Sequence, residues 1–149
     1  MAIGDGWTSR LLTGLAELLD AAGVGDWRPS GAYAAGETAI VIRAVPQAPD
    51  RLITLAAYPV GQDYVGLADS VSGVQIRVRA GADPRDCDDL ADAIYEALDG
   101  LTGVTWGGIP IVQVRRQSYT SLGTDTSGRW ERSENYYIDA MRPTAWNTD

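Results

Sequence analysis

The sequence contains no histidine, no lysine and no phenylalanine, and all 12 of its basic residues are arginines. Without histidine it cannot build a Ser-His-Asp or Cys-His nucleophile. Without lysine it lacks both the phosphate-binding lysine of P-loop enzymes and a Schiff-base amine. Zinc sites made from histidine and cysteine are excluded as well. Chemistry based on carboxylates, or on Mg²⁺ or Ca²⁺ held by carboxylates, is what remains, and we expect no enzyme activity, cofactor or metal.

Cysteine is almost absent, and long apolar runs are missing. The single Cys87 excludes an intramolecular disulfide. No apolar run approaches the roughly 20 residues needed to span a bilayer, and the first residues lack the basic region of a signal peptide. The chain has 149 residues, of which 45% are hydrophobic and 21% charged. We therefore expect one folded domain with its own core.

Positive charge is scarce relative to negative charge. The 20 acidic residues outnumber the 12 arginines, which leaves a formal net charge of −8. This balance argues against a protein that grips nucleic acid by neutralising phosphates or docks on an anionic membrane. It is compatible with a protein past which DNA slides without sticking.

Two segments have helical periodicity. Leucines and alanines recur at helical spacing from Thr8 to Ala22, with Thr8 or Ser9 as the expected N-cap. Gly14 inside this helix suggests a close packing contact. The second helix is expected at 84–98, where Asp83 is a good N-cap and a proline occupies the first helical position.

The rest of the chain alternates between strand and turn patterns. The expected strands are 37–45, 51–58, 72–80, 104–106, 109–118 and 130–141. Loops are expected at 25–36, 61–70 and 119–128, and the tail from 143 or 144 to 149 is expected to be loose. This order predicts an α+β fold with a largely antiparallel or mixed sheet and two helices on one face. The opposite face, with Arg77 and Arg79, would be open to water or to another subunit.

Three local features resemble chemical sites, but each has a simpler explanation. The acids of the second helix (Asp86, Asp88, Asp89, Asp92, Glu96 and Asp99, with Asp83 nearby) could bind a divalent metal, but a solvated helix face is the favoured interpretation. Thr124–Gly128 is similar to an interrupted aspartic-protease triplet, and we expect a plain turn. Cys87 lies on the apolar stripe and is expected to be buried.

Aromatic and arginine residues supply the candidate interface. All 12 aromatic residues are Trp or Tyr, which are enriched at protein interfaces, although they also pack on sheet faces. Arginine has the same preference for subunit contacts, whereas surface salt bridges are its alternative role. The interface candidates are Tyr64, Leu67, Arg77, Arg79, Arg115, Arg116, Tyr119, Leu122, Trp130 and Tyr136.

Several colinear stretches resemble one protein family. They are Arg10–Leu19, Gly31–Ile40, Ala57–Val60, Leu67–Ser70, Val74–Arg77, Asp83–Pro84, Asp88–Asp92, Ser121–Gly123 and, most specifically, Gly128–Tyr137. Together they resemble the small minor capsid or tail-terminator proteins of siphophages from high-GC hosts. The resemblance implies an α+β virion protein at the phage neck. It also implies a homohexameric ring that caps the tail tube, meets neck proteins such as the stopper, and lets DNA pass through its lumen.

Other functions stay open at this point. One is a head-completion, stopper or adaptor protein of the connector, and another is a small ligand-binding protein of the host cytoplasm. A carboxylate-dependent hydrolase is a third. For the ring, we expect assembly in the host cytoplasm, with loops 61–70 and 119–128 becoming ordered on the tube end, and Trp130 as an anchor of a subunit or neck contact.

Overall fold

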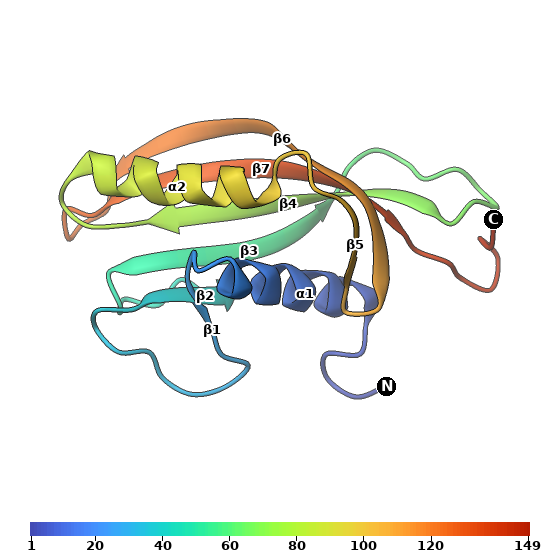
Figure 1. Ribbon diagram of the computed structural model, residues 1–149, viewed down its shortest axis with the longest axis horizontal. Helices are drawn as coiled ribbons and strands as arrows, with labels where there is room; N and C mark the ends of the chain where they lie inside the picture. The colour runs from blue at the N-terminus through green and yellow to red at the C-terminus, as the bar shows by residue number, and fades with distance from the viewer.

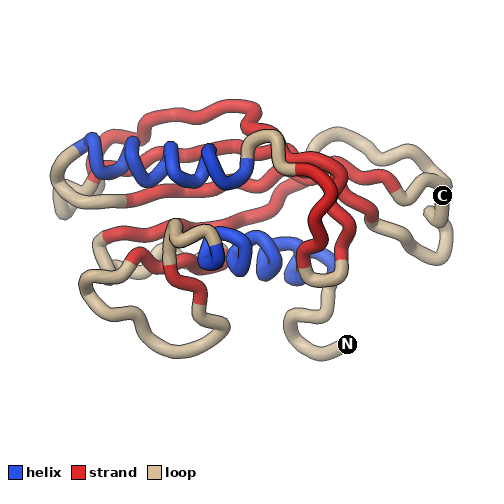
Figure 2. The backbone as a smooth tube through the Cα atoms, in the orientation of Figure 1, coloured by secondary structure: helices blue, strands red, loops and turns tan.

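The computed structural model describes residues 1–149 and contains two helices and one seven-stranded sheet (Figures 1 and 2). The helices are α1 (Trp7–Ala21) and α2 (Pro84–Leu98). The strands are β1 (Asp26–Trp27), β2 (Thr38–Ile42), β3 (Arg51–Pro59), β4 (Asp69–Arg79), β5 (Thr102–Trp106), β6 (Ile109–Thr124) and β7 (Trp130–Met141). Neither helix is long and apolar enough to span a membrane.

The sheet is mixed, with strand order β1-β2-β3-β4-β7-β6-β5. β1, β2 and β3 run parallel, and every other neighbouring pair is antiparallel. The predicted α+β class and the mixed, largely antiparallel sheet are therefore confirmed. Sequence reasoning missed β1, because two residues are too few to show strand periodicity.

Both helices cover the same face of the sheet, as Figure 1 shows and as predicted. The inward residues Val74, Ile76 and Val78 of β4 alternate with polar residues, and they join one core cluster with the apolar stripes of α1 and α2. At the β3–β4 register Ile53 lies opposite Val78 and Leu55 opposite Ile76, so β3 adds its side chains to the same core. The strict alternation of β4 thus decides which face is buried.

The bounds of α2 are as predicted, whereas α1 begins one residue early. Asp83 accepts a hydrogen bond from the Arg85 backbone N–H at 3.0 Å, so it is the N-cap of α2. The expected cap of α1 at Thr8 or Ser9 is wrong. Gly6 is its N-cap and supplies no side-chain hydrogen bond.

Gly14 gives α1 its close contact, as expected. The β5–β6 hairpin bends beside α1 (Figure 1), and a Cβ added at Gly14 would lie 2.2 Å from the Cβ of Trp106 and 2.6 Å from its Cα. Only glycine allows this approach of helix to strand. Trp106 is buried and belongs to the core.

The largest error concerns the segment 119–128, which is not a loop. β6 continues to Thr124 and stays paired with β7, with register shifts on the way, and the turn is confined to 125–129. The low hydrophobicity of residues 119–124 gives no strand pattern in the sequence. This part of β6 is held by its pairing with β7 and not by a buried apolar face. Segment 119–124 is already a strand in the single chain, so the hypothesis that it becomes ordered on assembly loses its basis. Of the predicted loop 61–70, residues 61–68 do connect two strands, but 69 and 70 begin β4.

The C-terminal tail is docked rather than loose. The Gly66 N–H donates to the side chain of Asn147 at 2.7 Å, and the backbones of Thr148 and Asp149 donate to Gly66. Arg142 also donates its backbone N–H to Ala68. Backbone and amide groups make these contacts, so no apolar pattern in the sequence indicates them.

Candidate assembly surfaces

Most arginines form ion pairs within the molecule, whereas most acids do not. Eight of the 12 arginines form ion pairs with nine acids, which leaves 11 of the 20 acids without an arginine within 4.0 Å. The surface field is therefore acidic, and the structure shows no basic stripe along which a nucleic-acid backbone could lie.

The acidic face of α2 divides into two sets. Asp83 caps the helix, Asp86 pairs with Arg51, Asp88 pairs with Arg132, and Asp99 accepts the backbone N–H of Arg116 at 2.8 Å. The others, Asp89, Asp92 and Glu96, are exposed and unpaired. No three acids or thiols of the chain gather in a metal-binding geometry.

A stack of arginines and tyrosines joins α2 to the long hairpin of β6 and β7. Arg116 of β6 lies over the ring of Tyr95 at 4.2 Å and that of Tyr119 at 4.9 Å. Arg132 of β7 also lies over the ring of Tyr119, 3.8 Å from its centroid. Such cation–π contacts fix the planes of both rings and guanidinium groups. Both tyrosines still reach the surface, where Tyr119 is 52% exposed.

Beneath this stack lies Glu134, which is completely buried. Arg132 donates to both of its carboxylate oxygens at 3.1 and 3.0 Å, and Arg116 lies 3.6 Å away. Burial raises the pKa of Glu134, and the two arginines oppose that shift. The buried carboxylate therefore depends on these two arginines, because no other basic group lies within 4.0 Å of it.

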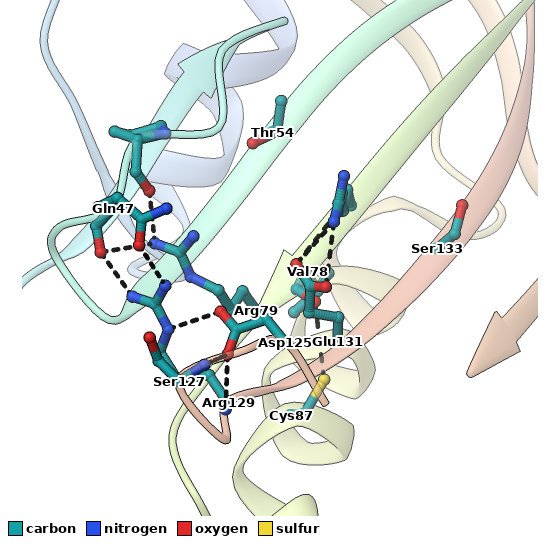
Figure 3. A network of polar contacts seen from close by, with 12 residues as sticks. Gln47, Thr54, Val78, Arg79, Cys87, Asp125, Ser127, Arg129, Glu131 and Ser133 are labelled. Carbon is teal, nitrogen blue, oxygen red and sulfur yellow. Dashed lines mark hydrogen bonds and ion pairs between the residues drawn. The ribbon is translucent and has the colours of Figure 1, made fainter. Parts of the chain in front are cut away.

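The connection between β2 and β3 is held by two further arginines, which Figure 3 shows from close by. Arg79 donates to the carbonyl oxygens of Pro46, Pro49 and Asp50 at 2.8 to 2.9 Å. Arg129 bonds the side chain of Asp125 at 2.8 Å and the carbonyl of Gln47. Together Arg79 and Arg129 form a clamp that connects the β6–β7 turn to the loop that follows β2.

This clamp corrects one interface candidate. Arg79 is only 2% exposed, so the expectation that it lies on an open face is wrong. The sequence alternation is correct, but the 43–50 connection folds over the end of that face and supplies carbonyl acceptors. Burial, followed by the nearby charge of Arg129, lowers the pKa of Arg79.

Tyr136 is a second candidate that the structure removes from the surface. Its side chain is fully buried in the core, and burial raises the pKa of its hydroxyl. Trp130 is half-buried, packs against the core and donates its indole N–H to Ala82 at 3.1 Å. Cys87 is buried as predicted, and burial raises the pKa of its thiol to about 11.

The face opposite the helices is polar, and no helix covers it; the 43–50 connection lies over one end. Arg77 pairs there with Glu131, and Arg115 pairs with Asp139 at 3.1 Å and lies over Tyr137 at 5.6 Å. Both arginines are partly exposed. The residues form cross-strand pairs, so this face carries little positive charge that is not already paired.

The connection between β3 and β4, which contains Tyr64 and Leu67, lies near the C-terminus and at the other end of the molecule from the β6–β7 turn (Figure 1). They line a hollow of about 430 Å³ whose other residues are Gln62, Asp63, Asp69, Ser70, Val71, Val112, Asp139 and Ala140. Tyr64 is 79% exposed. The structure therefore separates the candidates into an end hollow (Tyr64, Leu67), a polar face (Arg77, Arg115) and the β6 strand (Arg116, Tyr119, Leu122).

Sequence reasoning missed Tyr95, Arg132 and Glu134. A signal existed, because Arg132 and Glu134 lie at steps of two before Tyr136 and therefore on the same face of β7. Tyr95 lies at the edge of the apolar stripe of α2, four residues after Ala91 and seven residues after Asp88. Charged residues on the inward face of a strand indicate a buried network of ion pairs. Their partners on β6 and α2 are known only once the strands and helix are placed together.

Comparison with known proteins agrees with this architecture. One similar solved structure is a chain of "Virion of native gene transfer agent (GTA) particle", with 16% identity, a TM-score of 0.61 and coverage of 89% of this chain and 95% of that chain. This likeness concerns the fold. No curated protein matches the chain.

A family described as "Bacteriophage tail terminator protein" matches residues 18–142, which is most of the sequence and includes α2 and all strands. Proteins of this family are structural components of the virion that associate with other phage tail or head proteins, and they are not an enzyme family. The chain belongs to the bacteriophage tail terminator protein family.

Proposed function

We propose that this protein forms a homohexameric ring at the neck of a siphophage-like particle. The ring caps the tail tube, stops its growth, and joins the tail to a stopper or other head-completion protein. The proposal rests chiefly on the family match over residues 18–142. Assembly would take place in the host cytoplasm before the finished particle is released.

The charge distribution supports passage of DNA through such a ring. Six copies would carry six times the formal net charge of −8, and eight of the arginines are already paired internally. An acidic lumen repels phosphates, so DNA would meet no adhesive sites. The end hollow with Tyr64 and Leu67, the polar face with Arg77 and Arg115, the β6 residues Arg116, Tyr119 and Leu122, and Trp130 are the proposed contact surfaces.

Electron microscopy of lysates from a particle producer without this gene tests the proposal. We expect overlong, irregular tails beside full heads that have no tails. Normal-length detached tails beside heads that have lost DNA would instead place the protein on the head side of the neck. Intact particles would contradict both functions.

A further inference from the structure

The long strand β6 has an edge without a partner. β5 pairs with β6 only between residues 109 and 113, and Gly100 and Leu101 extend the contact to Val114. The carboxylate of Asp99 then accepts the N–H of Arg116. From 117 to 124, β6 pairs with β7 on one side, and no strand lies on its other side.

This free edge lacks the usual protection against pairing. Segment 117–124 contains no charged residue and no proline, and it carries the exposed apolar side chains of Tyr119 and Leu122. Natural edge strands are normally blocked by lysine or proline, kept short, or covered. Register shifts at 117 and 122 bend the edge but leave it open to solvent. Such an edge is suited to being covered in an assembly.

The surface beside this edge is acidic. Asp92 lies one turn from Asp88 and from Tyr95, whose side chains contact the two arginines of the hairpin. Asp92 therefore lies on the side of α2 that faces β6, and it is exposed and unpaired. A partner that covers the edge meets this negative charge.

The complementary charge is present elsewhere on the same chain. Arg43 and Arg142 have no carboxylate within 4.0 Å, and both line a hollow of about 190 Å³ with Tyr58 and Pro59. Arg43 adopts φ +62°, a conformation that β-branched and bulky residues rarely hold and that asparagine and aspartate tolerate. Arg43 donates to the carbonyl of Ala57 at 3.5 Å and Arg142 lies over the ring of Trp7 at 4.6 Å, so neither positive charge is neutralised by a carboxylate.

We propose that the free edge of β6, with Asp92 beside it, contacts the Arg43–Arg142 hollow of a second copy of this chain. The contact is head-to-tail: pairing two β6 edges about a twofold axis would bring the acids of two α2 helices together. Head-to-tail contacts close into rings when the rotation between subunits permits. The inference rests on the proposed ring function and identifies its subunit interface.

Charge reversal tests the contact in a producer that lacks the gene. Asp92→Arg and Arg43→Asp should each lower the yield of joined particles by about tenfold or more, because each places like charges across the contact. A chain that carries both changes should recover yield to within a few-fold of the unaltered protein. Glu17→Arg reverses a similarly exposed acid on α1 and should leave the yield unchanged.

The edge is tested independently by Leu122→Lys, which adds a blocking charge. It should lower the yield, whereas Ala35→Lys, at an exposed residue of the connection between β1 and β2 that belongs to none of the proposed surfaces, should not. Thermal melting of each purified variant checks that it folds. Single variants with normal yield, or a double variant no better than either single one, would overturn the copy-to-copy contact. Intact particles from the producer without the gene would instead contradict the ring function itself.

Discussion

The two helices are attached to the same sheet by different kinds of contact. α1 is packed through leucines and through the approach of Gly14 to Trp106. α2 has an apolar stripe as well, but its side toward β6 is held by Arg116, Arg132 and buried Glu134. The first attachment depends on shape, and the second depends on charge. The difference indicates that the α2 side of the fold is the more sensitive to the loss of one charged side chain. The free edge of β6 lies on this same side.

The sharpest way to break the charged attachment is Arg132→Met. Removal of this guanidinium leaves Glu134 completely buried with only Arg116 at 3.6 Å, so we expect a loss of about 3–5 kcal/mol in the free energy of unfolding. Urea unfolding measures it. Arg85→Met removes an exposed ion pair with Asp83 and should change stability little. Equal losses in the two variants would show that Glu134 is not held as the structure indicates.

The shape-dependent attachment is broken by Gly14→Ala. The new methyl group would overlap the backbone of Trp106, so helix and hairpin must separate, at a cost of about 1–3 kcal/mol. Gly36→Ala is the matched control because no atom lies within 4 Å of its added Cβ. A Gly14→Ala protein with the stability of the control would mean that α1 packs less closely than described.

Trp130 combines apolar and polar contacts, since it packs on the core and donates its indole N–H to the carbonyl of Ala82. Trp130→Phe retains an aromatic ring but loses that hydrogen bond and part of the packing area, so we expect the free energy of unfolding, measured by thermal denaturation, to fall by at least about 0.5–1.5 kcal/mol. If Trp130 is a neck or subunit anchor, head–tail joining falls in Trp130→Ala by more than its stability loss explains. Normal joining by that variant would remove Trp130 from the proposed surfaces.

The smallest expected effect is a pH dependence at the β6–β7 turn. Hydrogen bonds from the Arg129 backbone, then from its side chain and from Ser127, lower the pKa of Asp125 below 3.8. The unfolded chain therefore binds the proton more readily. The stabilisation is present above pH 3.8 and is lost as pH falls through the lower folded pKa.

The melting temperature of Asp125→Asn should accordingly fall less than that of the unaltered protein between about pH 5 and pH 3. Thermal unfolding by circular dichroism across this range measures the difference. Parallel curves for the two proteins would mean that the carboxylate of Asp125 does not contribute to the acid sensitivity.

Much of the fold was predictable because the responsible signals are local. Asp83, Pro84 and the apolar stripe define α2 within one stretch of sequence, and the alternation of β4 defines its buried face. The family resemblance at Gly128–Tyr137 was readable for the same reason and is confirmed by the family match. Among the interface candidates, Tyr64, Tyr119 and Leu122 are exposed, but Tyr119 and Leu122 lie on β6 and not in the loop that the sequence predicted.

The sequence by itself determined the absence of histidine and lysine chemistry, the excess of negative charge, both helices and the buried face of β4. Only the tertiary structure decided the fates of Arg79, Tyr136 and segment 119–124. Arg79 is buried because a connection distant in sequence supplies its carbonyl acceptors, and 119–124 is a strand because β7 pairs with it. These outcomes depend on contacts between distant segments, which local periodicity and propensity do not encode.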